Sequence, residues 1–209
     1  MSLREKIFAD MKNSSKREFF DRKAVGWDKR NHPDDTLLIR ELIERFDLKP
    51  TDWILDAGTG NGVLLPYLSV KVQRGGRIFA LDFSGRMILQ AKRNHQKKNI
   101  SFLNASVEAL PIKDRKFDCI TCFSMFAHVC DKKGSIREMS RVLKRGGRLF
   151  IVHPFGKKEL AGHHKSAGGA VEHDTLPPDP AMKKMMRDCG FHDIRIIDQP
   201  GFYWASAKR

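Results

Sequence analysis

Short apolar runs alternate with longer amphipathic stretches from about residue 50 to the end of the chain. Short, bounded apolar runs are typical of buried strands, and apolar residues that recur every three to four positions are typical of helices. Strands that alternate with helices form a mostly parallel sheet with helices on its faces. We therefore predict an α/β fold for this part of the chain.

The pattern predicts seven strands and the helices between them. We expect strands at residues 53–57, 77–82, 100–103, 117–123, 148–153, 192–197 and 202–207, and helices at residues 63–72, 84–96, 135–144 and 180–189. A long connection rich in Gly and His precedes the last of these helices. Two N-terminal helices, at residues 3–23 and 34–46, are predicted to form a cap over the open end of the sheet.

Length and composition favour one domain. A chain of 209 residues suits a single α/β domain (1–209), here divided into the helical cap (1–50) and the sheet-containing core (51–209). No apolar run approaches the ~20 residues that cross a bilayer. The charged N-terminus also lacks the apolar core of a secretory signal. We expect a cytoplasmic protein, monomeric or homodimeric, with no membrane association.

The four cysteines are interpreted as reduced thiols, because they are too few and too clustered for a disulfide framework. Cys119 and Cys122 have the spacing of a zinc knuckle but lie within a predicted strand. Residues three apart on a strand point to opposite faces of the sheet, so these two thiols are predicted to pack in the core.

The formal net charge of +14 is large for this length and raises the question of a nucleic-acid partner. Lys and Arg are, however, spread over several segments, mostly at positions expected on solvent-facing sides of helices. A scattered excess of charge more often serves solubility, so nucleic acid is the less favoured partner.

A glycine-rich turn is the sharpest chemical signal. Gly58, Gly60 and Gly62 directly follow the first strand, Trp53 to Ala57, and open the next helix. Glycines permit positive φ and let a ligand approach the backbone. Asp82 ends the second strand, where a carboxylate can accept the ribose hydroxyls of an adenosine. The carboxyl ends of adjacent parallel strands meet at one edge of the sheet, so this Asp is favoured as a ligand contact over a helix cap.

The chain resembles the class I S-adenosylmethionine-dependent methyltransferases over residues 50–209. The glycine turn and Asp82 match the first two motifs of that family, residues 105–111 match its adenine-binding stretch, and residues 143–149 match the segment that enters strand five. The resemblance implies a three-layer, Rossmann-like sandwich. Its sheet would have seven mostly parallel strands, of which the last is antiparallel. It also implies an enzyme that uses S-adenosylmethionine as cofactor.

The resemblance assigns cofactor-binding roles to ten residues: Asp56, Gly58, Thr59, Gly60, Gly62, Asp82, Phe83, Ser106, Val107 and Phe123. Asp56 would orient the turn and the amino acid moiety, and Phe123 would lie near the methyl-transfer site. Ser106 stands where the family usually has an adenine-binding aspartate. A hydroxyl can still accept a hydrogen bond there, although adenine recognition would be weaker.

The segment after the fourth strand indicates a small-molecule acceptor. Residues 123–128 read Phe-Ser-Met-Phe-Ala-His and lack the Asn-Pro-Pro-Tyr type motif of enzymes that methylate planar amino groups. They are more similar to the small-molecule branch of the family. His128 is the predicted general base, because an imidazole titrates near neutral pH. An RNA methyltransferase, and a non-catalytic protein that binds adenosylmethionine or a metal, are the alternatives.

Further histidines are expected near the same edge of the sheet. One hypothesis is a divalent metal site formed by His153, His163, His164 and His173, with His32 nearby in the cap. The alternative, favoured for any single histidine, is a set of separate hydrogen-bonding side chains in a polar pocket. Phe19, Phe20 and Trp27 are predicted to belong to a lid over the cofactor cleft.

Overall fold

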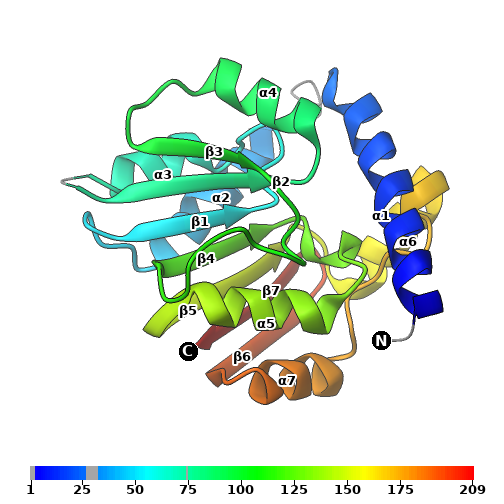
Figure 1. The fold of residues 1–209 in the computed structure, drawn as a ribbon. Coiled ribbons are helices and arrows are strands. Elements are labelled where there is room, and N and C mark those ends of the chain that lie inside the picture. Colours follow the sequence, from blue (N-terminus) through cyan, green and yellow to red (C-terminus); the bar gives the residue numbers. More distant parts are fainter. Residues whose placement is uncertain (1–2, 27–32, 74) are drawn as a thin grey trace.

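The computed structural model describes residues 3–26, 33–73 and 75–209, with side chains from Met11 to Gly26 and from Leu37 onward. It contains one seven-stranded sheet with the order β3-β2-β1-β4-β5-β7-β6 (Figure 1). The strands are β1 (Trp53–Ala57), β2 (Arg77–Asp82), β3 (Ile100–Asn104), β4 (Phe117–Phe123), β5 (Leu143–His153), β6 (His192–Gln199) and β7 (Phe202–Lys208). β7 is antiparallel to both of its neighbours, and the other pairs are parallel. The predicted Rossmann-like sheet is confirmed.

The helices are α1 (Leu3–Ala24), α2 (Pro33–Arg45), α3 (Leu65–Lys71), α4 (Gly85–Asn94), α5 (Lys132–Val142), α6 (Lys157–Ala167) and α7 (Asp179–Asp188), with short 3-10 turns η2 (Phe126–His128) and η3 (Gly169–Val171). Local side chains fix several helix starts. Ser84 accepts a hydrogen bond from the Met87 amide at 3.2 Å, so it caps α4. Asp131 caps α5 in the same way.

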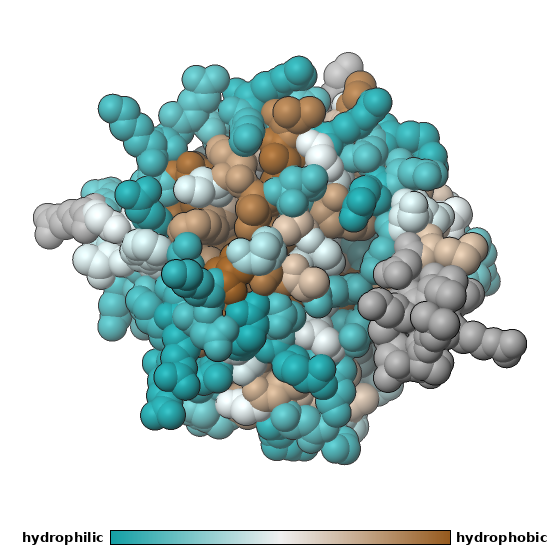
Figure 2. Space-filling model, in the orientation of Figure 1, coloured by the Kyte–Doolittle hydropathy of each residue, from teal (hydrophilic) through white to brown (hydrophobic). Residues whose placement is uncertain are grey.

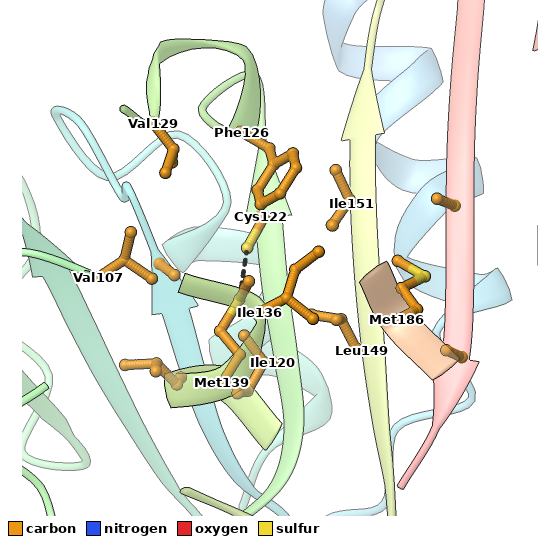
Figure 3. Packing of buried hydrophobic residues seen from close by; sticks show 14 of the residues in the cluster. Val107, Ile120, Cys122, Phe126, Val129, Ile136, Met139, Leu149, Ile151 and Met186 are labelled. Atoms are coloured by element: carbon orange, nitrogen blue, oxygen red, sulfur yellow. Dashed lines mark hydrogen bonds between the residues drawn. The ribbon is translucent and has the colours of Figure 1, made fainter. Parts of the chain in front are cut away.

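Two hydrophobic clusters cover the two faces of the sheet. One cluster joins β4, β5 and β7 to α5 and α7, and Figure 3 shows Ile136 and Met139 of α5 beside Leu149 of β5 and the neighbouring strand β4. The other joins α2 and α3 to the opposite face. Cys122 lies in the first cluster, where its thiol is 3.5 Å from the Met139 sulfur, and Cys119 lies in the second. The prediction that these two cysteines point to opposite faces is confirmed.

The two N-terminal helices have different places. α1 crosses the edge where the parallel strands end, and it contacts α4 and η3 (Figure 1). α2 instead buries Ile39, Leu42 and Phe46 in the cluster with α3. The prediction that residues 34–46 belong to the cap is therefore wrong. An amphipathic helix packs on the largest apolar surface within reach, which here is the face of the sheet.

Two further segments differ from the sequence prediction. The Gly- and His-rich connection contains a helix, α6, and the amide of its N-cap residue Gly156 donates to the Glu159 carboxylate at 2.9 Å. β5 begins at Leu143 and not at residue 148 as predicted, so Gly146 and Gly147 lie inside the strand. The preceding helix, α5, ends at Val142, where pairing of Leu143 with Phe117 begins the strand.

The connection from β3 to β4, residues 105–116, contains no helix. Arg141 of α5 holds it by donating to the backbone oxygens of Ile112 at 2.7 Å and Leu110 at 3.0 Å. Trp53 and Phe79 on the sheet face beside it are only partly buried. Figure 2 shows hydrophobic side chains gathered over β1–β3 on an otherwise largely hydrophilic face.

No helix in the described part of the chain is long and apolar enough to cross a membrane.

Candidate functional site

The glycine turn after β1 folds back on the end of β2. Gly58, Gly60 and Gly62 all have positive φ, at 74°, 56° and 93°. The amides of Gly58 and Thr59 both donate to the Leu81 oxygen, at 2.8 and 2.9 Å. Glycine is favoured at these φ values, so the triplet lets the turn lie against the neighbouring strand.

Asp82 connects this turn to the start of α4. One carboxylate oxygen accepts from the Gly60 amide and the other from the Ser84 amide, each at 2.9 Å. Burial raises the pKa of Asp82 to about 6, although the two amide bonds oppose this rise. Each carboxylate oxygen has a second lone pair, so Asp82 can still accept hydroxyl donors from a ligand.

Asp56, two residues before Gly58, is buried beneath the turn. Its carboxylate accepts from the Thr121 hydroxyl of β4 at 2.9 Å. Burial raises the pKa of Asp56 to about 6, and the hydroxyls of Thr59 and Thr121 lower it. Two buried carboxylates at one edge of the sheet give this site negative potential near neutral pH.

A hollow of about 380 Å³, including the solvent at its mouth, lies beside the turn. It is bounded by residues from the ends of β1, β2, β3 and β4 and by one residue of α1: Asn13, Gly58, Leu81, Phe83, Ala105, Ser106, Val107, Glu108, Met125, His128 and Val129. Four of the predicted cofactor residues, and the predicted base, therefore line one space. Most of its lining is apolar, as is usual for ligand pockets.

Sequence reasoning gave no individual role to six residues of this hollow, among them Met125, Glu108 and Asn13. The Met125 side chain lies directly over Gly58, where an added Cβ would be 2.1 Å from the Met125 Cγ. Glu108 accepts from the Cys130 amide and from the Asn13 amide group of α1, each at 2.9 Å. Contacts between segments so far apart in the chain leave no mark on local sequence pattern.

His128 stands at the wall of the hollow, in a cluster of charged side chains. Its Nδ1 lies 2.8 Å from one oxygen of Asp174, and the Lys16 ammonium lies 2.5 Å from the other. Burial lowers the pKa of His128, although Asp174 opposes this. The imidazole is therefore neutral at pH 7, as a proton acceptor must be.

The remaining predicted metal ligands do not converge. The His153 ring is buried, with a pKa lowered to about 3 by burial. His163 is exposed and stacks on Phe155, and His173 is exposed. His164 Nδ1 lies 2.6 Å from the Asp174 carbonyl oxygen, to which it donates.

Among residues 3–26, 33–73 and 75–209, no three His, Cys, Asp or Glu side chains are arranged to hold a metal ion. The structure therefore does not support the predicted metal site. His153 ends β5, His163 and His164 are neighbours in α6 with ring centroids 6.0 Å apart, and His173 follows η3. His32 and Trp27 lie outside the described residues.

Known proteins resemble this chain in sequence. The family model described as "Methyltransferase domain" matches residues 55–151. The ubiquinone/menaquinone biosynthesis C-methyltransferase UbiE of Pectobacterium carotovorum is 31% identical over 189 residues, which cover 78% of this chain and 75% of the relative. UbiE of Francisella tularensis subsp. novicida is 27% identical over 188 residues, with the same coverage of 78% and 75%.

The chain is a class I S-adenosylmethionine-dependent methyltransferase. Solved structures share the fold of this methyltransferase. A chain of the complex between the Haloferax volcanii Trm112 methyltransferase activator and a methyltransferase has a TM-score of 0.74 at 22% identity, covering 90% of this chain and 96% of that one. A SAM-dependent methyltransferase from Aquifex aeolicus has a TM-score of 0.70 at 24% identity, with the same coverage of 90% and 96%.

The residues of this methyltransferase fit the cofactor on one side of the site. Phe83, Ser106 and Val107 line the hollow, and Asp82, which is buried and lies between the lining residues Leu81 and Phe83 in sequence, has acceptor oxygens of the kind that ribose hydroxyls require. The Met125 side chain lies over Gly58, where the methionine moiety of the cofactor is expected, so this side chain has to move when the cofactor binds. The unbranched Met125 side chain can do so by rotation.

The other predicted cofactor residues lie apart from the hollow. Thr59 is buried, a Cβ added at Gly62 would lie 2.6 Å from the His95 ring, and Phe123 packs toward the cluster formed with α2 and α3. The cofactor roles of all ten residues stay predictions that binding measurements can test.

Proposed function

We propose that this methyltransferase transfers the methyl group of S-adenosylmethionine to a small-molecule acceptor and that His128 is the general base. One observation carries the proposal: Gly58, Ser106 and His128 line the same hollow, so the cofactor turn and a neutral imidazole face one space. The UbiE relatives support a small acceptor, because their names place them in ubiquinone and menaquinone synthesis.

S-adenosylmethionine supplies an electrophilic methyl group on a sulfonium. The chain's residues align the acceptor and exclude water. The acceptor atom forms a bond to the methyl carbon as the sulfur–carbon bond breaks, and its proton passes to the unbonded nitrogen of His128. Burial lowers the pKa of His128, so the proton-accepting form dominates at neutral pH. α1, which crosses the open edge of the sheet, limits the access of water to this step.

Calorimetry with S-adenosylmethionine and S-adenosylhomocysteine tests the cofactor assignment. We expect both to bind, and Asp82→Asn to weaken binding roughly 10- to 100-fold, because hydrogen bonds to a charged group contribute about 1.5–3 kcal/mol. Asp118→Asn is the control, since Asp118 accepts hydrogen bonds from the Trp53 amide and the Lys144 ammonium where β1 and β4 begin, at the opposite end of these strands. Absence of binding by the wild-type protein would contradict the proposal.

An acceptor panel tests the function itself. Methyl transfer is measured with phenols, quinols, thiols and structured RNA, using release of S-adenosylhomocysteine as the readout. We expect transfer to a small molecule and a loss of turnover in His128→Ala without loss of cofactor affinity. Transfer to RNA alone would favour the alternative suggested by the charge of +14, and cofactor binding without any transfer would favour a non-catalytic role.

We further propose that residues 1–209 act as one methyltransferase domain in the cytoplasm, as a monomer or homodimer. Four free cysteines, two of them buried, suit a reducing compartment. Light scattering of the purified protein measures its oligomeric state.

A further inference from the structure

Asp174 is tied to three distant parts of the chain. Its carboxylate contacts His128, which is 46 positions away and follows β4, at 2.8 Å. Its other oxygen contacts Lys16 of α1, which is 158 positions away, at 2.5 Å. Its backbone oxygen accepts from His164 of α6 at 2.6 Å. A residue held from three sides has little freedom to change its orientation.

The contact with Asp174 determines which nitrogen of His128 carries the proton. Burial alone would raise the pKa of Asp174, but the bonds from His128 and Lys16 outweigh it, so its pKa is below the ordinary value. The ionised carboxylate only accepts hydrogen bonds, and His128 Nδ1 must therefore donate. In a neutral imidazole this leaves Nε2 with the lone pair.

Lys16 binds one oxygen of the Asp174 carboxylate, so the other oxygen faces His128. Its ammonium is 3% exposed and donates to Asp174 and, at 2.7 Å, to the His128 backbone oxygen. An ammonium has no acceptor atom, so Lys16 always requires an acceptor oxygen on the group that faces it. The same lysine attaches α1 to the base-bearing turn η2, where Phe20 of α1 also packs edge-on against the His128 ring.

We infer that Asp174 is a positioning residue that makes Nε2 of His128 the proton acceptor, and that Lys16, by docking with α1, fixes which Asp174 oxygen faces His128. This inference rests on the proposed function, in which His128 takes the proton of the acceptor. It assigns to the cap a second task besides covering the cleft, because Lys16 of α1 fixes the Asp174 side chain against His128.

Nitrogen NMR of the protein labelled with ¹⁵N-histidine tests the inference without any acceptor. The His128 signals are assigned by their absence in His128→Gln. We expect wild-type His128 at pH 7 to carry its proton on Nδ1. A proton on Nε2 in the wild-type protein would overturn the inference, and this measurement needs no variant at the ion pair.

Asp174→Asn should invert the tautomer. Lys16 donates to the Asn oxygen, so the Asn amino group faces His128 Nδ1 and forces the proton onto Nε2, as in Ser-His-Asp triads with the same replacement. Adding Lys16→Met frees the Asn to rotate and should restore Nδ1–H. Lys16→Met alone should keep Nδ1–H. An unchanged tautomer in folded Asp174→Asn, or no restoration in the double variant, would contradict the inference.

Asp52→Asn is the matched control, because the Asp52 side chain is as buried as that of Asp174, at 6% and 8% exposed, and forms an ion pair with Arg148 at 2.6 Å. It should leave the His128 signals unchanged. With an acceptor from the panel, Asp174→Asn should lower kcat roughly 100- to 10,000-fold, the range of general-base catalysis, while the KM for S-adenosylmethionine stays constant. Calorimetry with S-adenosylhomocysteine distinguishes the two proposals. Loss of cofactor binding would contradict the proposed function, whereas an unchanged His128 tautomer in an Asp174→Asn protein that still binds the cofactor would contradict only the role of Asp174.

Discussion

At the scale of single residues, the site depends on buried carboxylates held at the edge of the sheet. Asp56 and Asp82 are both nearly inaccessible to solvent, and burial raises the pKa of each to about 6. An ionised group that loses its water destabilises the fold unless a ligand or donor replaces that water. We therefore expect these two carboxylates to favour cofactor binding at the expense of stability.

Asp56→Asn should stabilise the protein without cofactor at pH 7. The pKa of Asp56 rises from 3.8 to about 6 on folding, so its ionisation lowers the free energy of unfolding progressively as pH rises through that interval. The penalty is absent below pH 3.8 and complete above about pH 6, where it is on the order of 2–3 kcal/mol. Urea unfolding of both proteins between pH 4 and pH 8 measures it. A difference that does not grow with pH would contradict the expectation.

Gly58→Ala and Gly60→Ala should differ although both positions have positive φ. At Gly60 an added Cβ meets nothing within 4 Å, so only backbone strain of about 1–2 kcal/mol is expected. At Gly58 the Cβ would also clash with Met125, which adds about 1–3 kcal/mol. Chemical unfolding compares the two. Met125→Ala should recover part of the loss in Gly58→Ala, and equal effects at both glycines would show that Met125 does not fill this space.

At the scale of elements, the segments that build the hollow are held by side chains of their neighbours more than by their own structure. The loop 105–116 supplies Ser106, Val107 and Glu108 to the site but contains no helix. Its far half is held by Arg141, and its near half by Glu108, which bonds the start of the segment after η2. A loop fixed in this way can shape an adenine pocket as firmly as a helix does.

Arg141→Ala should loosen this loop. The variant loses the bonds to the Leu110 and Ile112 carbonyls, and a loss of about 2 kcal/mol is expected at about 1 kcal/mol for each bond. Urea unfolding gives the magnitude, and hydrogen exchange of amides 105–116 gives the location. Lys184→Ala, which removes an exposed ion pair with Asp188, is the control and should change stability by less than about 0.5 kcal/mol. A similar change in the free energy of unfolding in Arg141→Ala and Lys184→Ala would contradict this expectation.

At the scale of the whole molecule, the core and the cap are built separately. Both hydrophobic clusters consist of the sheet and the helices on its faces, and neither includes a described side chain of α1. α1 is attached by polar and aromatic contacts of Lys16, Phe20 and Asp21, the last of which accepts from the Ser84 hydroxyl at 2.5 Å. Such contacts are weaker than burial of a large apolar face, so the cap can open without unfolding the sheet.

Deleting residues 1–26 should leave a folded sheet with a weakened site. We expect cooperative thermal unfolding to persist, because the two clusters remain complete. Affinity for S-adenosylhomocysteine should fall at least about tenfold, since the hollow loses Asn13 and its cover. Calorimetry and thermal unfolding measure the two effects. Loss of cooperative unfolding would show that the core depends on α1.

The sequence alone determined the sheet, the glycine turn and the place of Asp82, because these depend on local properties. Apolar periodicity sets which segments become strands, and a glycine that follows a strand sets where a tight turn forms. The predicted strands agree with the observed ones within a few residues, except that β5 begins five residues earlier, at Leu143 instead of Arg148.

Only the tertiary structure decided the surroundings of His128 and the fate of the other histidines. Asp174 lies 46 positions from His128 and 158 positions from Lys16 in the sequence. No local sequence pattern records such contacts. The predicted metal site failed for the same reason. Convergence on one edge of a sheet brings residues into the same region, but packing of α1, α6 and the loops sets the distances of a few ångströms on which ligand binding and proton transfer depend.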